Sequence, residues 1–217
     1  MTSEQRYPGL FVVFEGGDSV GKSTQVRYLR ASLEQENVPH VITFEPGDTW
    51  LGAHMRHLVL SPESGDIRAK TEALLYIADK AQHVAELVIP ALQEGKVVVS
   101  DRYVDSTIAY QGNGRQLCAD EVERVARWAT DDLRPDLTVV LDADPAQAVE
   151  TIESKDRLES AGLELHARAR QAFLDIAAAD SERYLVLNAF APREQIAASV
   201  RDRLATLGLQ LPAPVTR

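Results

Sequence analysis

Short runs of consecutive apolar residues alternate along the chain with longer segments in which apolar residues recur at helical spacing. The runs are Leu10–Phe14, Val97–Val99, Leu137–Leu141 and Tyr184–Leu187, with His40–Phe44 as a candidate fifth. Because apolar residues follow one another here instead of alternating with polar ones, the runs predict strands that are buried on both faces, as in a parallel sheet.

Segments of helical periodicity fill the intervals between these runs. They are Lys22–Glu36, Lys70–Gln93, Asp120–Thr130, Leu163–Ala179 and Arg193–Leu207. Strands that alternate with helices predict an α/β fold, with a central parallel sheet of about five strands flanked by helices and joined by right-handed crossovers. Trp50 and Trp128 are expected to be packing residues of this fold.

The chain carries no internal repeat and no linker, and its 217 residues with 45% apolar content suit one core. We predict a single domain over residues 1–207 and a flexible tail over 208–217, which contains Pro212 and Pro214. Glu153–Gly162 is charged, ends in glycine and lies between two predicted helices. This segment is either a solvated loop or a mobile lid.

Charge and cysteine content exclude several classes of protein. The formal net charge is −10 and the pI is near 5.0, which argues against binding to a nucleic-acid backbone. Cys118 is the single cysteine, so no internal disulfide can form. No uncharged apolar run approaches the roughly 18 residues of a membrane span. We therefore predict a cytoplasmic protein without a membrane or nucleic-acid partner, although local donors can still bind small phosphorylated ligands.

A glycine-rich motif directly follows the first apolar run. Residues 16–23 read GGDSVGKS, which matches G-x-x-x-x-G-K-[ST] at the start of a predicted helix. In such loops backbone N–H groups surround the phosphates, the lysine reaches the β- and γ-phosphates, and the hydroxyl binds Mg²⁺. The expected nucleotide contacts are Gly16, Gly17, Asp18, Ser19, Val20, Gly21, Lys22, Ser23 and Thr24. The motif predicts use of ATP or GTP but not the reaction.

Two predicted strands end in an aspartate, where P-loop folds often hold Mg²⁺ through water. The candidates are Asp101 and Asp142, and the pattern alone does not choose between them. The residues after Asp101 do, because residues 101–112 read DRYVDSTIAYQG. This stretch closely resembles the DRY-x-x-S-x-x-AYQ signature of bacterial thymidylate kinases.

The resemblance covers most of the chain, from Phe11 to about Leu204. Residues 45–47 (EPG), with Leu51-Gly52 and Arg56, resemble the REPGG…LG…R segment of the family, and residues 72–90 resemble its acceptor-binding helix. Residues 156–159 (DRLE) resemble the DRIE of its lid, and residues 168–173 match the R-x-R-x-x-[YF] that follows.

The resemblance implies a P-loop nucleoside monophosphate kinase fold with a short lid at about residues 153–162. It implies transfer of the γ-phosphate of ATP, with Mg²⁺, to dTMP, which yields dTDP for dTTP synthesis. It also implies a homodimer, with the apolar faces of helices such as Lys70–Gln93 as candidate contact surfaces.

Site residues are implied position by position. Tyr76 would stack on thymine, Lys80 would hydrogen-bond a thymine carbonyl, and Thr107 and Gln111 would read the edge of the base. Tyr110 would lie against the deoxyribose and disfavour a 2′-hydroxyl. Arg56 and Arg102 would bind the acceptor phosphate, and Asp18 would orient the acceptor. Glu45 would position the sugar or a metal-bound water molecule. Ser23 and Asp101 would hold Mg²⁺.

The chain departs from the family pattern at several positions. Phe44 and Asp48 replace the arginine and the second glycine of REPGG, and Lys80 replaces an arginine. Ser19 occupies a loop position that is arginine in the eukaryotic-like branch, so the lid is expected to supply the arginine that stabilises the transferring phosphoryl group. We hypothesise that Arg157 is this residue, acting with Lys22, Asp18 and Arg102.

Two other interpretations remain open at this stage. The first keeps the fold and changes the acceptor, to another deoxynucleotide or to a deoxynucleoside. The second is a non-catalytic nucleotide-binding homologue, which Phe44, Lys80 and the few cations of the lid motivate. Arg56 and Arg102 favour an acceptor that already carries a phosphate.

Overall fold

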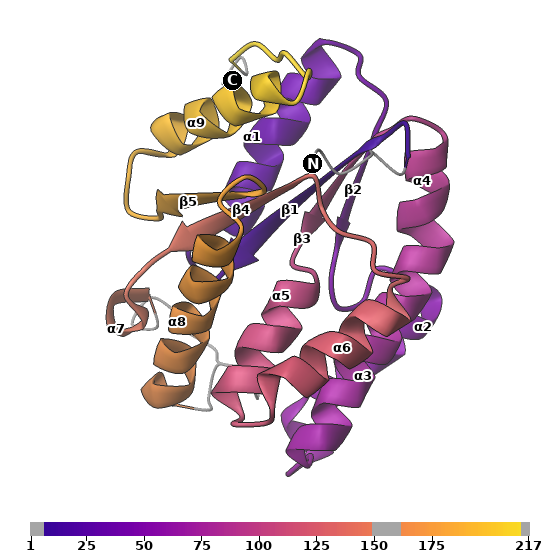
Figure 1. The fold of residues 1–217 in the computed structure, drawn as a ribbon, viewed down its shortest axis with the longest axis vertical. Coiled ribbons are helices and arrows are strands. Elements are labelled where there is room, and N and C mark those ends of the chain that lie inside the picture. Colours follow the sequence, from indigo (N-terminus) through magenta and orange to yellow (C-terminus); the bar gives the residue numbers. More distant parts are fainter. Residues whose placement is uncertain (1–6, 149–161, 214–217) are drawn as a thin grey trace.

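The computed structural model of the protein describes residues 7–148 and 162–213. Its strands form one parallel sheet in the order β2-β3-β1-β4-β5 (Figure 1). The strands are β1 (Leu10–Gly16), β2 (His40–Phe44), β3 (Val97–Asp101), β4 (Leu137–Asp142) and β5 (Tyr184–Asn188). The predicted parallel sheet is confirmed, and each strand begins at the first residue of the apolar run that predicted it.

Helices connect the strands and cover both faces of the sheet (Figure 1). They are α1 (Lys22–Gln35), α2 (Trp50–Leu60), α3 (Ala69–His83), α4 (Ile89–Gln93), α5 (Val104–Thr107), α6 (Ala119–Ala129), α7 (Pro145–Ala148), α8 (Leu163–Ala179) and α9 (Arg193–Thr206). A 3₁₀ turn covers Pro62–Ser64, and π-helical segments cover Val84–Val88 and Ile108–Gly114.

The structure differs from the predicted helices in two places. The helix expected over Lys70–Gln93 is divided by the π-helical turn Val84–Val88, which precedes Pro90. Proline has no N–H to donate and its ring crowds the preceding turn, so a wider turn accommodates it. Neither α2 nor the helical run 104–114 was predicted. In the run 104–114, glycine and β-branched residues lower the helix propensity, so packing against the rest of the fold decides its conformation.

Side chains of β1 point alternately to the two faces of the sheet and are buried on both. Val12 and Phe14 pack with apolar residues of α1 and α9. Phe11 and Val13 pack with residues of α3, α4 and α6 on the opposite face. A third apolar cluster joins α8 to β4 and to the π-helical segment Ile108–Gly114. The sheet therefore has no face open to solvent at its centre, as the continuous apolar runs predicted.

A buried carboxylate fixes the start of the helical run 104–114 relative to β1. Glu15 Oε1 accepts hydrogen bonds from the backbone N–H of Tyr103 (2.8 Å) and Ser106 (3.1 Å), and its Oε2 accepts one from the Ser106 hydroxyl (2.6 Å). Burial, and then the nearby charge of Asp105, raise the pKa of Glu15 to about 7. An acceptor at this place satisfies N–H groups that a helix leaves unpaired in its first turn.

The two tryptophans and the C-terminal leucines differ in exposure from what the sequence predicted. Trp50 and Trp128 were expected to pack inside the fold, but they are 78% and 80% exposed on α2 and α6. Helical position, not residue type, decides their exposure, because both lie on faces turned away from the sheet. In the predicted tail, Leu209 and Leu211 pack against the cluster between the sheet, α1 and α9.

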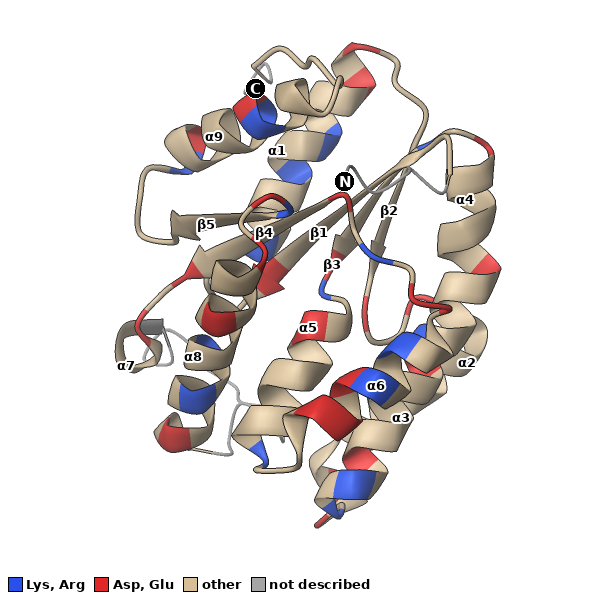
Figure 2. Ribbon diagram, in the orientation of Figure 1, with Lys and Arg blue, Asp and Glu red and all other residues tan. Residues whose placement is uncertain are grey.

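Charged residues of both signs are spread over the helices (Figure 2). This distribution accompanies the excess of Asp and Glu, 33 against 23 Lys and Arg. None of the described helices is long and apolar enough to cross a membrane. The division into one domain with a lid stays a prediction, since residues 149–161 lie outside the described part of the chain.

Candidate active site

The loop from Gly16 to Ser23 turns from the carboxyl end of β1 into α1. Two of its glycines have positive φ, 129° at Gly16 and 94° at Gly21. A Cβ at Gly16 would lie 2.5 Å from the carbonyl oxygen of Leu141 on the neighbouring strand, so this position admits no side chain. The loop therefore turns sharply and leaves its backbone N–H groups at the amino end of α1, where a phosphate binds best.

Lys22 is buried, and its side chain folds back towards the start of this loop. Its Nζ donates to the carbonyl oxygen of Gly16 at 3.2 Å and also to that of Gly17. Burial, and then the positive charge of Arg102, lower the pKa of Lys22 to about 8. Backbone carbonyls thus hold the ammonium group at the loop, where an anionic phosphate would supply a stronger acceptor.

The two strand-end aspartates have different partners. Asp101 Oδ2 accepts a hydrogen bond from the Ser23 hydroxyl at 3.1 Å. Asp142 instead accepts two hydrogen bonds from Arg170, at 2.6 and 2.9 Å. A hydroxyl and a carboxylate at the edge of the loop are oxygen ligands that suit Mg²⁺. Asp101 with Ser23 is therefore the better fit to a metal, while Asp142 is engaged by a guanidinium.

Beside the loop lies an open cleft with about 650 Å³ of empty space. It is bounded by the loop, the ends of β2 and β3, and residues of α2, α3 and the helical run 104–114. Its walls comprise Asp18, Glu45, Pro46, Arg56, Leu60, Tyr76, Lys80, Arg102, Ser106, Thr107, Tyr110 and Gln111. The structure thus brings every residue that was expected to contact the acceptor to one cleft, although these residues come from segments far apart in the sequence.

Arg102 connects the loop to the helical run that forms the opposite wall. Its Nη1 donates to the carbonyl oxygen of Gly16 and to the Ser106 hydroxyl, both at 3.0 Å, and its Nη2 pairs with Asp18. The guanidinium also lies over the ring of Tyr110, 5.4 Å from its centroid. Its backbone φ of 73° is uncommon for a residue with a side chain, and uncommon conformations of this kind gather at functional sites.

Asp18 forms an ion pair with this guanidinium at the side of the cleft next to the loop. Burial alone would raise the pKa of Asp18, but the charges of Arg102 and Lys22 outweigh it and hold the pKa below its usual value. The Tyr110 hydroxyl donates to the other oxygen of the same carboxylate at 3.4 Å. The carboxylate is therefore ionised and oriented before any ligand binds.

The far end of the cleft combines an aromatic ring with hydrogen-bonding side chains. Tyr76 is 7% exposed, and Lys80 Nζ lies 6.0 Å from the centroid of its ring. Thr107 and Gln111 lie one helical turn apart in the run 104–114, and both are almost fully buried. An aromatic face next to hydrogen-bonding groups can bind a base by stacking and by its edge.

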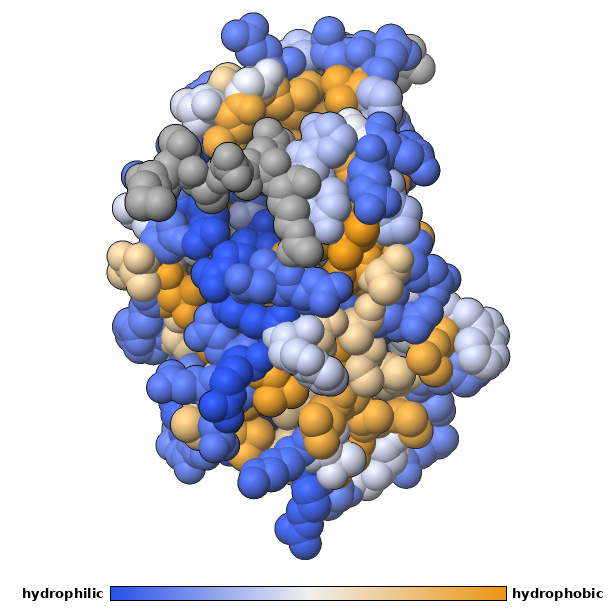
Figure 3. Space-filling view, turned by 45° about the vertical axis from the view of Figure 1, so that its right-hand side comes forward, coloured by the Kyte–Doolittle hydropathy of each residue, from blue (hydrophilic) through white to orange (hydrophobic). Residues whose placement is uncertain are grey.

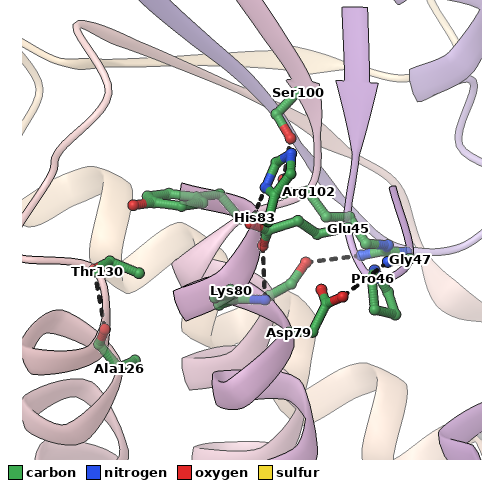
Figure 4. A network of polar contacts seen from close by, with 12 residues as sticks. Glu45, Pro46, Gly47, Asp79, Lys80, His83, Ser100, Arg102, Ala126 and Thr130 are labelled. Atoms are coloured by element: carbon green, nitrogen blue, oxygen red, sulfur yellow. Dashed lines mark hydrogen bonds and ion pairs between the residues drawn. The ribbon is translucent and has the colours of Figure 1, made fainter. Parts of the chain in front are cut away.

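A chain of polar contacts lies behind this end of the cleft, and Figure 4 shows its buried part, formed by Glu45, Lys80 and His83. Glu45 Oε2 pairs with Lys80 Nζ at 2.9 Å, and its Oε1 lies 2.6 Å from His83 Nδ1. The other ring nitrogen of His83 lies 2.6 Å from the Thr43 hydroxyl. The Thr43 hydroxyl in turn donates a hydrogen bond to Asp48 Oδ2, also at 2.6 Å.

This chain leaves His83 with two acceptors and no donor. The single proton of the Thr43 hydroxyl goes to Asp48, so the histidine Nε2 must donate to Thr43, while Nδ1 donates to Glu45. A ring that donates from both nitrogens is an imidazolium. Burial would lower the pKa of His83, but its hydrogen bond and charge pairing with Glu45 raise it. Lys80 and His83 together lower the pKa of Glu45 despite its burial.

Sequence reasoning missed several polar residues that shape the site. They are Thr43, Glu72, Asp79, His83, Ser106, Arg115 and His166. A signal was present in α3, where Glu72, Tyr76, Asp79 or Lys80, and His83 repeat at helical spacing. These residues form one buried polar face, a pattern that is hard to distinguish from a solvated face without the sheet.

The departures from the family pattern have structural roles here. The Arg56 guanidinium lies over the Phe44 ring, 5.6 Å from the centroid, and donates to the carbonyl oxygen of Pro46 at 2.7 Å. Asp48 accepts from Thr43 at the end of the buried chain. Phe44 therefore supplies an aromatic surface for Arg56, and Asp48 supplies the last acceptor behind the cleft.

The predicted lid arginine, Arg157, lies outside the described residues, as do residues 153–161 of the predicted lid. On α8, Arg168 donates to the carbonyl oxygen of Gly114 at 2.8 Å, and Arg170 binds Asp142 beside the loop. Within residues 7–148 and 162–213, no three His, Cys, Asp or Glu side chains are grouped as a protein-only metal centre requires.

Comparison with known proteins gives a consistent result. The thymidylate kinase family profile matches residues 14–200. A thymidylate kinase of Cutibacterium acnes is 61% identical over 199 residues, which cover 92% of this chain and 98% of that one. One from Halothermothrix orenii is 44% identical over 87% of this chain and 92% of its own. The crystal structure of the Ehrlichia chaffeensis thymidylate kinase superposes with a TM-score of 0.74 at 28% identity, covering 93% of this chain and 99% of that one.

The charge of His83 predicts a pH-dependent stability. Because folding raises the pKa of His83 above its ordinary value of 6.5, its stabilisation is complete below that pH and is lost as the pH rises through the raised value. We expect His83→Gln to lower the free energy of unfolding by about 3–5 kcal/mol at pH 6, as for other broken buried ion pairs. Denaturant unfolding should show this difference shrinking towards pH 9.

The matched control is His57→Gln, because His57 is exposed on α2 and lies on the surface. This variant should unfold like the parent protein at every pH. A stability loss in His83→Gln that stays constant from pH 6 to pH 9 would show that His83 is neutral in the folded protein.

Proposed function

The chain belongs to the thymidylate kinase family, and from this premise we propose which residues carry out the transfer. It is an ATP-dependent nucleoside monophosphate kinase that transfers the γ-phosphate of ATP to dTMP. The related proteins described above are all thymidylate kinases, so neither a changed acceptor nor a non-catalytic role has support. We further propose that it acts in the cytoplasm, where ATP and deoxynucleotides are available.

The observation that carries the assignment of roles is the cleft itself. One wall is the phosphate loop and the other is the helical run 104–114, and Arg102 contacts both. A nucleotide in the cleft would place its phosphate near Arg102 and Asp18, next to the loop that holds ATP. Alignment of two substrates in this way supplies much of the rate acceleration in phosphoryl transfer.

We propose that dTMP binds with its thymine at the Tyr76 end and its phosphate at Arg56 and Arg102. Tyr76 would stack on the ring, Lys80 would donate to a carbonyl, and Thr107 and Gln111 would bind the base edge. Tyr110 would lie against the deoxyribose. Glu45, held by Lys80 and His83, would orient the sugar or a water molecule on the metal.

At the donor side, the residues Gly16 to Thr24 would hold the ATP phosphates. Lys22 would exchange its backbone acceptors for phosphate oxygens, and Asp18 would orient the acceptor. Ser23 and Asp101 would hold Mg²⁺, which neutralises charge on the β- and γ-phosphates when bound. The acceptor phosphate is largely ionised at neutral pH, so these residues need not supply a general base.

Arg157 is our candidate for the arginine that stabilises the transferring group. Ser19 provides no charge in the loop, and Arg168 and Arg170 are engaged by Gly114 and Asp142. The sequence places Arg157 in the predicted lid, between two segments that border the loop side of the site.

We also propose a homodimer formed by the side of the molecule that carries α2, α3 and α6. Leu74 on α3 is 59% exposed, and Trp50 and Trp128 are exposed on the neighbouring helices. Figure 3 looks towards this side, and apolar patches interrupt the hydrophilic surface in its lower half. Exposed apolar surface of this kind supports a contact with a second chain.

A panel of acceptors tests the assigned substrate. With ATP and Mg²⁺, dTMP should be turned over fastest, and thymidine should have a kcat/KM at least about 100-fold lower, because it lacks the phosphate that two charged hydrogen-bond donors bind. ADP release measured by a coupled assay checks this. No turnover of dTMP would contradict the proposed function.

Arg157→Ala tests the role of the lid. Loss of an arginine that acts at the transferring phosphoryl group should lower kcat by about 1,000-fold, with a smaller effect on the KM for dTMP. Lys155→Ala is the matched control, since it removes a neighbouring cation of the same segment, and it should change kcat only a few-fold. A kcat for Arg157→Ala within a few-fold of the parent would exclude this role.

Sedimentation velocity tests the proposed dimer. The chain of 23.9 kDa should sediment as a dimer, and Leu74→Glu should shift it towards the monomer by placing a charge in the contact. Leu163→Glu is the control, because Leu163 is similarly exposed, at 54%, but lies on α8. A parent protein that sediments as a monomer at micromolar concentration would refute the proposal.

A further inference from the structure

Gln111 has one end of its side-chain amide fixed by a residue outside the cleft. Its side chain is almost fully buried in the cleft wall, and its Nε2 donates to Glu72 Oε1 at 3.0 Å. Glu72 is fully buried on α3 and is not among the described residues that line the cleft. The hydrogen bond therefore runs from the wall of the cleft into the protein behind it.

Glu72 is itself held by a second partner. Arg115 Nε donates to Glu72 Oε1 at 3.1 Å, and Arg115 Nη2 donates to Oε2 at 3.2 Å. Both oxygens of the carboxylate thus accept from one planar guanidinium. A carboxylate in this state has no proton to give, so it can bind only the amino end of the Gln111 amide and never its carbonyl end.

The consequence is a fixed polarity at the cleft wall. With its nitrogen committed to Glu72, Gln111 has its carbonyl oxygen left to face the cleft. An acceptor at this position matches the N3–H donor of thymine. Cytosine carries a lone pair at N3 and an amino group in place of the O4 carbonyl, so two acceptors would face each other.

We propose that Glu72 is a specificity-determining positioning residue: by holding the amide of Gln111 in one orientation, it selects pyrimidines that carry N3–H and rejects cytosine nucleotides. The inference rests on the proposed function, because it requires dTMP to bind with its base at this end of the cleft. It assigns the choice of base to a residue that does not touch the substrate.

The other polar groups at this end cannot make the same choice alone. The Thr107 hydroxyl is buried and has no hydrogen-bond partner in the described part of the chain, and a hydroxyl can donate or accept as the base requires. Lys80 can only donate, and Glu45 holds it in place. Lys80 therefore favours a carbonyl at the base edge, while the Gln111 carbonyl, fixed by Glu72, supplies the acceptor for N3–H.

Glu72→Gln tests this role. A neutral amide at position 72 can present its amino group to Gln111, which allows the Gln111 amide to turn over and offer its own amino group to cytosine. We expect the ratio of kcat/KM for dCMP to that for dTMP to rise about tenfold or more, the effect of one hydrogen bond gained or lost. The ratio for dUMP to dTMP should stay unchanged, because uracil has the same N3–H and O4.

The chain offers a matched control. Gln82 Nε2 donates to Glu86 Oε2 at 2.7 Å, which is the same kind of glutamine–glutamate pair on the same helical stretch, but at the surface. Glu86→Gln should leave both ratios, dCMP to dTMP and dUMP to dTMP, unchanged. Thermal unfolding of both variants shows whether each is folded.

If Glu72→Gln does not fold, Arg115→Gln provides a second test. Arg115 is 25% exposed at its side chain, and the change removes the partner that keeps Glu72 in place while Glu72 itself stays in the chain. The ratio for dCMP to dTMP should rise in the same direction, by a smaller factor.

The outcomes separate the inference from the proposed function. An unchanged dCMP ratio in a folded variant that still phosphorylates dTMP would overturn the role of Glu72 alone. An equal rise for dUMP and dCMP would also overturn it, because a general loosening of the cleft does not depend on N3–H. A parent protein that does not turn over dTMP would overturn the proposed function itself.

Discussion

The guanidinium of Arg102 is the contact on which the arrangement of the site depends. It bonds the phosphate loop through Gly16 and Asp18 and the acceptor wall through Ser106, so it fixes the distance between the two. Its own position follows from the sheet, because Asp101 lies opposite Phe14 in the register of β3 and β1, and the Arg102 N–H donates to the Phe14 carbonyl. Glu15 adds a second link between the same strand and the same helical run. Strand register thereby sets the spacing between the loop Gly16–Ser23 and the opposite wall of the cleft.

Buried and half-buried cations around the cleft are paired with buried or half-buried carboxylates. Lys80 and His83 share Glu45, Arg115 holds Glu72, and Arg102 pairs with Asp18. Burying such pairs contributes little net stability, since desolvation offsets most of the attraction. Their benefit is orientation: each pair holds a side chain that borders the cleft in one geometry before a ligand arrives, which lowers the entropy lost on binding.

Sequence reasoning and structure agree where a simple physical rule applies. Continuous apolar runs such as Leu10–Phe14 favour strands covered on both sides, and Gly16 and Gly21 have the positive φ that the sharp turn after β1 requires. Agreement ends where the partner is set by the tertiary fold. Nothing in the sequence near His83 reveals that Thr43 and Glu45 contact its two ring nitrogens. Trp128 is a large apolar residue of the kind usually found in a core, but it is exposed on α6. The role of Arg157 stays a prediction.

The net charge of −10, with acidic and basic residues spread over the helices, affects how substrates arrive. ATP and dTMP are anions, so the net charge of the protein repels them, while the paired cations of the cleft act only at contact. At physiological salt, with a Debye length of about 8 Å, a nucleotide meets this repulsion only close to the surface. Diffusional capture is therefore unsteered, and raising the ionic strength speeds the encounter while it weakens the final grip.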